Sequence, residues 1–337
     1  MSALPFSVPA ELEATEPAEA RGIPRDAVAL LVSDARSGVH RSTTFDRIDE
    51  HLREGDLLVV NDSATIAAAL SAGRADGSRC IVHLSTSIDE SLWIVEPRHI
   101  ADARQGEVLT LPDGGAIRLL APVARQYARL WYATLALPLP AERYIAAYGR
   151  PIAYAYVTRP WPLAAYQTIF ARVPGSAEMP SAGRPFTARV VERLNQRGIE
   201  IATITLHCGV ASLETHEPPV EERFRVGPAT VEAVARTRRH GGRIIAVGTT
   251  VVRALESARD ENTAFGPRSG WTRHIVDRAH PPRVADGILT GLHEPRASHL
   301  SLLEAFVTPE FLMEGYALAL RERFLWHEFG DVHLIVR

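Results

Sequence analysis

The feature that most constrains the fold is an alternation of strand-like and helix-like segments that is broken once, in the middle of the chain. Residues 55–60 read as a buried strand, and residues 199–206 read as another. Thr187 is placed to cap a helix that is closed by Gly198, and Pro228 fits the first turn of the next helix. Strand–helix repetition of this kind predicts a largely parallel sheet with helices on its faces.

The middle of the chain has a different pattern. From about residue 79 to residue 138, short apolar runs follow one another closely, with turn residues between them. The sequence Pro112-Asp-Gly-Gly between two of these runs is a good hairpin signal, because glycine accepts positive φ at little cost. Closely spaced short strands predict a small antiparallel barrel or sandwich. We therefore expect a discontinuous α/β domain, made from the two ends of the chain, that is interrupted by a β-rich insert.

The composition excludes several kinds of chemistry. All 37 basic residues are arginine, so a Schiff-base lysine and a Walker-type phosphate loop are ruled out. The formal net charge of −3 argues against binding to nucleic acid by bulk electrostatics. Cys80 and Cys208 lie far apart, and no apolar stretch approaches the roughly 18 residues of a membrane helix. We expect a cytoplasmic protein that has no membrane partner.

Polar residues follow four of the predicted α/β strands at the point where each strand ends. They are Asn61-Asp62-Ser63, His207, Thr249-Thr250 and His293-Glu294. Because ligands bind at the carboxyl ends of parallel strands, four such groups on one edge predict a site. Simpler interpretations remain: Asn61 or Asp62 can cap a helix, and each histidine can be a structural residue. A metal site formed by the histidines with Asp62 or Asp286 is disfavoured, because no HxH or HExxH spacing supports it.

Several blocks of sequence, in a fixed order from about residue 5 to residue 335, resemble one known family. The blocks are Gly55-Asp-Leu-Leu-Val-Val-Asn-Asp62, Tyr166-Gln-Thr-Ile-Phe170, Pro180-Ser-Ala-Gly183, Thr205-Leu-His-Cys-Gly209, Ile245-Ala-Val-Gly-Thr-Thr-Val-Val-Arg-Ala-Leu-Glu-Ser257, Leu292-His-Glu-Pro295, Glu304-Ala-Phe306 and Phe329-Gly-Asp331. Together they resemble the S-adenosylmethionine:tRNA ribosyltransferase-isomerases of queuosine biosynthesis. The longest block, around Gly248 and Arg253, is the most specific.

The resemblance implies an α/β fold in which a barrel-like α/β domain, residues 1–70 and 155–337, is interrupted by a small antiparallel β-barrel, residues 71–154. It also implies the reaction. The ribosyl group of S-adenosylmethionine moves to the aminomethyl-deazaguanine of tRNA and is isomerised to give epoxyqueuosine, while adenine and methionine are released. S-adenosylmethionine is then a co-substrate and tRNA the acceptor, and we expect no metal and no permanently bound cofactor.

On this basis we predict catalytic roles for three residues at the strand ends. His207 and His293 are candidates for proton transfer, because the ribose methylene next to the sulfonium must lose a proton and adenine must leave. Asp62 is a candidate partner of the sulfonium or the ribose. The turn at residues 248–250, with Arg253, is expected to hold a carboxylate or a phosphate. Two aromatic residues, Tyr166 and Phe186, are expected to stack on a base. The full predicted binding set is Asn61, Tyr166, Gln167, Ser181, Gly183, Phe186, Gly209, Gly248, Thr249, Thr250, Arg253 and Asp331.

The chain departs from the family pattern beside the predicted site. The family's arginine after the first strand is replaced at Ala64, and changes also fall at Arg184, Pro185 and Glu294 and in residues 214–222. These departures leave two alternatives open: a paralogue that uses S-adenosylmethionine with a small-molecule acceptor, and a non-catalytic nucleoside- or RNA-binding protein on the same scaffold. A metal-dependent hydrolase that uses the two histidines is a more distant alternative.

Overall fold

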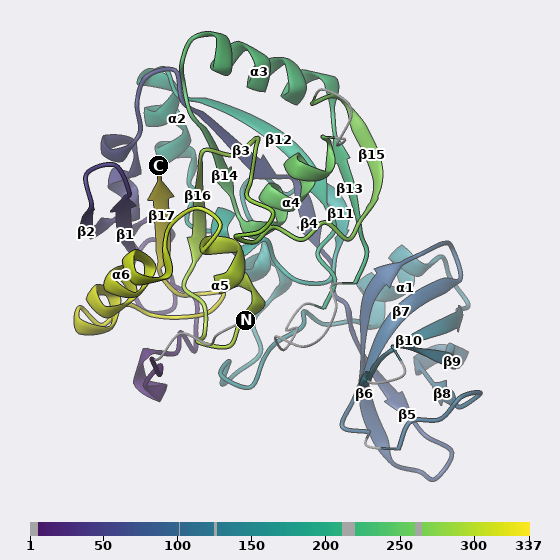
Figure 1. Ribbon diagram of the computed structural model, residues 1–337. Coiled ribbons are helices and arrows are strands. Elements are labelled where there is room, and N and C mark those ends of the chain that lie inside the picture. The colour runs from purple at the N-terminus through teal and green to yellow at the C-terminus, as the bar shows by residue number, and fades with distance from the viewer. Residues whose placement is uncertain (1–5, 101, 125–126, 211–219, 260–264) are drawn as a thin grey trace.

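The computed structural model describes residues 6–100, 102–124, 127–210, 220–259 and 265–337. Within these residues the chain forms a large α/β unit and, beside it, a small closed barrel (Figure 1). The predicted fold class, α/β with an inserted antiparallel β-barrel, is confirmed.

The large unit is built on a nine-stranded sheet. In order across the sheet, the strands are β15 (Arg268–Thr272), β13 (Glu222–Val226), β12 (Glu200–Leu206), β3 (Leu57–Asn61), β14 (Ile244–Val247), β16 (Gly287–Gly291), β17 (Val332–Val336), β1 (Ala29–Asp34) and β2 (Val39–Thr44). The neighbouring strands β12, β3, β14 and β16 are all parallel. Both margins of the sheet contain antiparallel pairs, so the sheet is mixed rather than largely parallel. One cause is the short β1–β2 connection, because parallel neighbours need a long crossover.

The central strands are buried on both faces of the sheet. In β3, Leu57 and Val59 belong to one hydrophobic core, and Leu58 and Val60 belong to the other. Successive side chains of a strand point to opposite faces, which explains why this segment reads as an unbroken apolar run. The two cores fix the sheet between helical layers and hold the strand ends in place.

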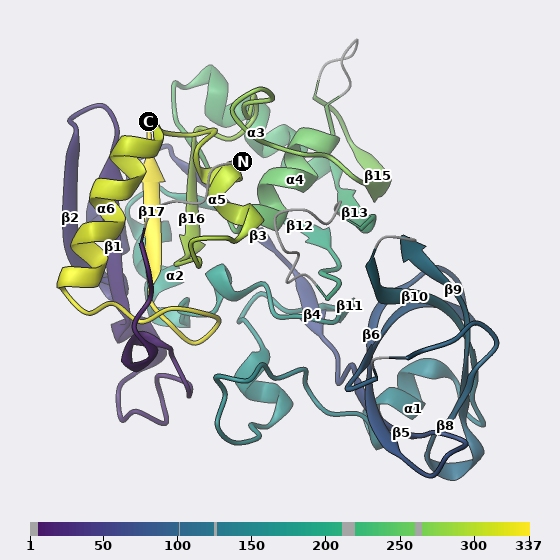
Figure 2. The ribbon, with the colours of Figure 1, turned by 60° about the horizontal axis from the view of Figure 1, so that its bottom comes forward.

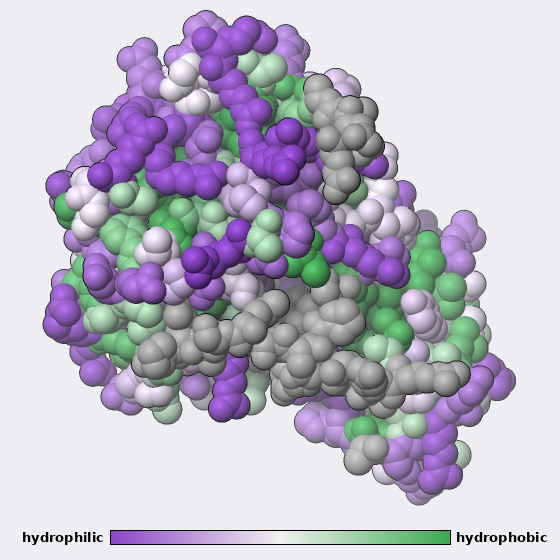
Figure 3. Space-filling view, in the orientation of Figure 1, coloured by the Kyte–Doolittle hydropathy of each residue, from purple (hydrophilic) through white to green (hydrophobic). Residues whose placement is uncertain are grey.

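Helices cover the two faces unequally. The core on one face contains residues of α3, α4, α5 and α6, and the core on the other contains residues of α2 and η3. As predicted, Thr187 caps α2, accepting the N–H of Val190 at 3.3 Å, and Pro228 opens α3, whose outer side is hydrophilic (Figure 3). The α-helices are α1 (Ala141–Tyr148), α2 (Ala188–Gln196), α3 (Pro228–Arg239), α4 (Thr249–Ser257), α5 (Ser298–Leu303) and α6 (Pro309–Arg321). The 3-10 helices are η1 (Ala10–Leu12), η2 (Arg25–Ala27), η3 (Phe45–His51), η4 (Pro112–Gly114), η5 (Leu163–Tyr166) and η6 (Ser181–Gly183).

The small unit is a six-stranded barrel that closes on itself, seen nearly end-on in Figure 2. Its strands are β5 (Ala69–Gly73), β6 (Arg79–Ser87), β7 (Leu92–Arg98), β8 (Val108–Thr110), β9 (Ala116–Ala124) and β10 (Tyr127–Ala136). The predicted turn at residues 112–115 joins β8 to β9, which pair antiparallel. A two-stranded parallel sheet of β4 (Ser63–Thr65) and β11 (Val173–Ser176) lies between the barrel and the large sheet.

Candidate active site

The predicted polar edge is present at the carboxyl ends of the four parallel central strands. Because β12, β3, β14 and β16 are neighbours in this order, the residues that follow them are brought to one edge of the sheet. The order along the edge is His207, then Asn61 and Asp62, then the turn at residues 248–250, then His293. Adjacent strands lie about 4.8 Å apart, so the edge is a few strand spacings long.

His207 is held by hydroxyl groups that sequence reasoning did not identify. The Ser63 hydroxyl lies 2.8 Å from Nδ1 of His207 and 2.6 Å from the Ser176 hydroxyl, which accepts the backbone N–H of Cys208 at 3.0 Å. Ser63 is in β4 and Ser176 is in β11, so the pairing of these short strands creates the network. Gly175 packs directly on the imidazole: a Cβ there would lie 2.5 Å from Nδ1 of His207.

The direction of the hydrogen bonds in this network depends on the tautomer of His207. In the arrangement that gives both hydroxyl protons an acceptor within the network, Ser176 donates to Ser63 and Ser63 donates to Nδ1 of the imidazole. Satisfying both hydroxyls in this way leaves the ring proton on Nε2. Burial, with the charge of Arg223, lowers the pKa of His207 below 6.5, so the ring is neutral at pH 7. His207 is therefore a neutral imidazole, and this arrangement assigns its N–H to the ring nitrogen away from Ser63.

Asn61 and Asp62 have different roles at the end of β3. The Asn61 side chain binds both backbone groups of Leu206: its amide donates to the carbonyl at 2.8 Å, and its oxygen accepts the N–H at 3.0 Å. Asn61 is only 3% exposed, so it joins β3 to β12 rather than facing a ligand. The Asp62 carboxylate accepts the Thr205 hydroxyl at 2.6 Å and remains partly exposed.

Arg253 was predicted to help hold a carboxylate or a phosphate of a ligand, but in the structure its guanidinium binds other groups of the protein. Its guanidinium forms an ion pair with Glu222 and donates to the backbone oxygen of His274 at 3.1 Å. The other oxygen of Glu222 accepts the N–H of Gly209 at 3.2 Å. The ion pair of Arg253 thus anchors the segment that follows His207. A Cβ at Gly209 would lie 2.8 Å from the Ser85 hydroxyl, so this glycine permits close approach of the barrel.

The turn after β14 begins helix α4. Gly248 has φ of +104°, a conformation that L side chains rarely adopt, and Thr249 is the first residue of the helix. A Cβ at Gly248 would lie 3.7 Å from Cβ of Ala182, which places η6, with Ser181 and Gly183, beside the helix N-terminus. The first N–H groups of an α-helix lack partners within the helix, so this end favours an anionic group.

His293, at the other end of the edge, is packed differently. Its Nε2 lies 2.8 Å from the Thr290 hydroxyl, and its ring stacks on His299 with centroids 4.5 Å apart and planes 4° apart. Burial, and then the neighbouring His299, lower the pKa of His293 well below 6.5. The imidazole is neutral and lies between its own strand and α5.

Four other predicted binding residues have structural contacts instead. Phe186 is fully buried, with ring centroids 4.9 Å from Phe45 and 5.1 Å from Phe170, and Tyr166 is only 3% exposed. The expectation that these two rings stack on a base is therefore wrong for this structure, because their faces are in the core. Gln167 binds both backbone groups of Thr65, at 3.0 and 2.8 Å. Asp331 accepts the N–H groups of Ala29 and Leu325, which joins the C-terminal segment to β1.

The departures from the family pattern also have structural explanations. Arg184 is buried, forms an ion pair with Glu19 at 2.8 Å and donates to the backbone oxygen of Ala165 at 3.0 Å. Ala64 lies in β4, Pro185 is buried directly after Arg184, and Glu294 lies 3.8 Å from Nε2 of His327. Of the altered segment 214–222, residues 214–219 are outside the described residues.

The described residues contain no group of three or more His, Cys, Asp or Glu side chains that could hold a metal ion. In the same residues, no helix has the length and apolar character needed to cross a membrane.

The fold and its polar edge define an α/β protein with an inserted barrel and a candidate site at the carboxyl ends of its central strands. Residues 1–335 match the sequence model of a family described as "Queuosine biosynthesis protein". The chain belongs to this family.

Named relatives match the chain over nearly its full length. The S-adenosylmethionine:tRNA ribosyltransferase-isomerase of Halothermothrix orenii is 32% identical and aligns with 98% of each chain, and that of Thermotoga maritima is 32% identical over 100% of this chain and 99% of its own. A crystal structure of S-adenosylmethionine tRNA ribosyltransferase from Thermotoga maritima has a TM-score of 0.58 at 28% identity, covering 99% of this chain and 100% of that one.

Proposed function

We propose that this protein is an S-adenosylmethionine:tRNA ribosyltransferase-isomerase. It transfers the ribosyl group of S-adenosylmethionine to the aminomethyl-deazaguanine of tRNA, isomerises it to give epoxyqueuosine, and releases adenine and methionine. The names of relatives that match the chain end to end support this reaction. In this proposal S-adenosylmethionine is a co-substrate, no metal or resident cofactor takes part, and the enzyme works in the cytoplasm, where tRNA is modified. The inserted domain is proposed to span residues 71–154, and its first strand, β5, begins two residues earlier at Ala69.

The observation that carries the proposal at the site is the hydrogen-bonded His207. Adenine leaves with the electrons of its glycosidic bond, so a donor near the purine stabilises the departing base. A neutral imidazole in the tautomer that carries its proton on Nε2 is such a donor. The partly exposed Asp62 carboxylate, whose charge acts on His207, is suited to lie beside the sulfonium or the ribose.

The first turn of α4 and His293 complete the proposed site. The N–H groups that open α4 at Thr249 and Thr250 suit the methionine carboxylate, since helix N-termini favour anions. Arg253 supports this site indirectly, through Glu222 and Gly209. His293 is the second candidate for proton transfer, and its stacking on His299 fixes the orientation of its ring.

The direct test is to incubate the protein with S-adenosylmethionine, with and without tRNA that bears the aminomethyl-deazaguanine, and to follow adenine and the mass of the tRNA. The expected result is adenine release that depends on this tRNA, with a matching gain in tRNA mass. The matched control is the same tRNA with unmodified guanine. Adenine release without tRNA would mean that the ribosyl group passes to water, which would contradict tRNA as the required acceptor. Binding without release would replace the proposal with a non-catalytic role.

A further inference from the structure

The margin of the large sheet beside His207 exposes one of its two faces. In β13, Phe224 and Val226 belong to the core that contains α3 and α4, so Arg223 and Arg225 point to the opposite face, where both are exposed. In the edge strand β15, Trp271 lies directly opposite Arg223 and is 41% exposed. Because residues directly opposite each other project from the same face, Arg223, Arg225 and Trp271 form one exposed surface, here called the β13–β15 face.

The β13–β15 face is continuous with the proposed active site. Thr205 of β12 lies opposite Arg225, and the N–H of His207 donates to the backbone oxygen of Arg223 at 3.0 Å. His207, Arg223 and Trp271 therefore form a row across three adjacent strands, which places Trp271 about 10 Å from His207 along this row. Burial first, and then the positive charge of Arg223, lower the pKa of His207, so the guanidinium and the imidazole lie near each other. A ligand bound at His207 can therefore extend onto the β13–β15 face.

The two arginines of this face carry charges that the fold does not use. Among the described residues, neither the Arg223 nor the Arg225 guanidinium has a hydrogen bond or an ion pair. Glu221, just before β13, is paired instead with Arg273, just after β15, at 2.9 Å. All the donors of the two guanidinium groups are therefore available to an anion from outside the chain.

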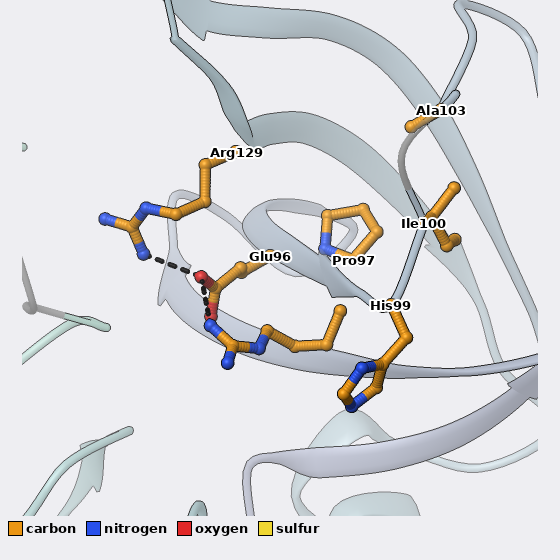
Figure 4. A pocket seen from close by; sticks show the side chains of 7 residues that line it. Glu96, Pro97, His99, Ile100, Ala103 and Arg129 are labelled. Atoms are coloured by element: carbon orange, nitrogen blue, oxygen red, sulfur yellow. Dashed lines mark hydrogen bonds and ion pairs between the residues drawn. The ribbon is translucent and has the colours of Figure 1, made fainter. Parts of the chain in front are cut away.

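Arginines beside other concave or functional parts of the molecule are bound to carboxylates. In a hollow of the barrel with a volume of about 420 Å³, Arg98 and Arg129 both contact the buried carboxylate of Glu96 (Figure 4). Arg253 is bound to Glu222 in the same way. These contacts stabilise the fold, whereas the β13–β15 face combines unpaired guanidinium groups with an exposed indole beside the proposed site.

An indole next to two guanidinium groups suits a single-stranded nucleic acid. Arginines contact backbone phosphates, and an aromatic ring stacks on a base of any identity. The indole of Trp271 can stack only on an unpaired base, because neighbouring base pairs cover the faces of a base within a duplex. A second copy of this chain is a poorer partner, since a symmetric contact through this face would bring the same arginines of both copies together.

We propose that the β13–β15 face binds an unpaired segment of the tRNA next to the nucleotide held at His207. Trp271 stacks on a base of this segment, and Arg223 and Arg225 contact its backbone phosphates. The inference rests on the proposed function for the identity of the RNA. Contacts of this kind position a nucleic acid without reading its sequence. They also allow a protein with a formal net charge of −3 to bind an anionic polymer through a local surface.

The test measures the dissociation constant of unmodified tRNA by filter binding from about 50 to about 200 mM KCl, which needs no turnover. Trp271→Ala is expected to weaken binding about 5- to 100-fold without changing the slope of log K against log salt, because stacking releases no counterions. Arg223→Gln and Arg225→Gln are each expected to weaken binding about five- to tenfold and to reduce the slope by about one.

Two matched variants control for the loss of a side chain as such. Trp271→Phe keeps an aromatic ring and is expected to retain most of the affinity. Arg239→Gln removes an exposed arginine at the end of α3, on the other face of the sheet, and is expected to keep the wild-type affinity and slope. As a competitor of tRNA, single-stranded RNA is expected to bind the wild-type protein better than a duplex of the same sequence, and Trp271→Ala should remove this difference.

Several results would overturn the inference: wild-type affinity for Trp271→Ala, wild-type slopes for both arginine variants, an equal effect of Arg239→Gln, or no tRNA binding by the wild-type protein. Equal competition by single-stranded and duplex RNA would also contradict it. If sedimentation shows that Trp271→Ala converts a dimer to a monomer while tRNA binding is unchanged, the face is an interface between copies and the inference is wrong. Binding of tRNA that depends on Trp271, without adenine release, would instead contradict the proposed function and leave this inference standing.

Discussion

The two ends of the polar edge hold their histidines in opposite ways. His207 is bound by hydroxyls of β4 and β11, and none of the described residues hydrogen-bonds its Nε2. His293 is bound by Thr290 of its own strand and stacks on His299 of the adjacent helix. At the His207 end, a network of hydroxyls from two other strands binds one ring nitrogen and leaves the other, Nε2, available to a ligand. At the His293 end, contacts within the same strand and the adjacent helix orient a neutral ring. From this difference we infer that His207 contributes more to proton transfer than His293, the second candidate.

The strongest way to break this comparison is to remove each histidine in turn. His207→Ala is expected to lower kcat/KM for adenine release by about 10²–10³, because one positioned donor to a leaving group is lost. Its free energy of unfolding is expected to fall as well, by about 1–3 kcal/mol, because the hydroxyl of Ser63, a residue only 1% exposed, loses a partner. His293→Ala is expected to lower the free energy of unfolding by about 1–3 kcal/mol, because the Thr290 hydroxyl, on a residue only 2% exposed, loses its partner.

Steady-state kinetics and urea unfolding of both variants measure these effects. His240→Ala, at an exposed position after α3, is the matched control for both measurements. If His293→Ala loses more activity than His207→Ala at equal stability, the assignment of the two ends is reversed.

A smaller change tests whether the position of His207 matters as well as its presence. Gly175 has φ of +152°, and an added Cβ would lie 2.5 Å from Nδ1 of His207, so Gly175→Ala must displace the ring. Displacement by about 1 Å is expected to cost roughly 10- to 100-fold in kcat. Gly291→Ala is the matched control, because a Cβ at the end of β16 would have no neighbour within 4 Å. Equal kinetics for the two variants would show that the ring tolerates displacement.

Much of the fold could be predicted because its signals are local. The cap at Thr187, the proline that opens α3 and the apolar run of β3 each depend on a few adjacent residues. The polar edge could also be predicted, since parallel strands place their carboxyl ends together. The mixed sheet was missed because strand–helix repetition indicates the parallel centre of the sheet but not the antiparallel pairs at its margins, such as β1 with β2 and β16 with β17.

The candidate site was predicted less completely, for the same physical reason. Ser63 and Ser176 contact His207 only because β4 pairs with β11, and no periodicity marks two strands this short. Residue type alone also did not reveal orientation: Phe186 faces the core, and Arg253 faces Glu222. One signal was available, because the glycine of Pro174-Gly175 indicates a close approach or an unusual φ.

The prediction with the smallest expected effect concerns how the free energy of unfolding depends on pH through the histidines near His293. Burial lowers the pKa of His299 from 6.5 to about 4 and that of His333, in neighbouring β17, to about 3. The unfolded chain takes up these protons near pH 6.5, whereas the folded chain does so only near pH 4 and below. Between these values the unfolded state binds more protons, so stability is complete above pH 6.5 and is lost as the pH falls.

His299→Phe keeps an aromatic ring against His293 but cannot be protonated. Between pH 6 and pH 5, the free energy of unfolding of the variant should depend on pH less steeply than that of the wild type, by about 1.4 kcal/mol per pH unit, the value for one proton. Urea titrations at several pH values measure this slope, and His240→Gln, at an exposed position, should leave it unchanged. An unchanged slope for His299→Phe would mean that His299 is protonated as readily in the folded chain as in the unfolded one. The contrast between the two ends would then rest on their hydrogen bonds alone.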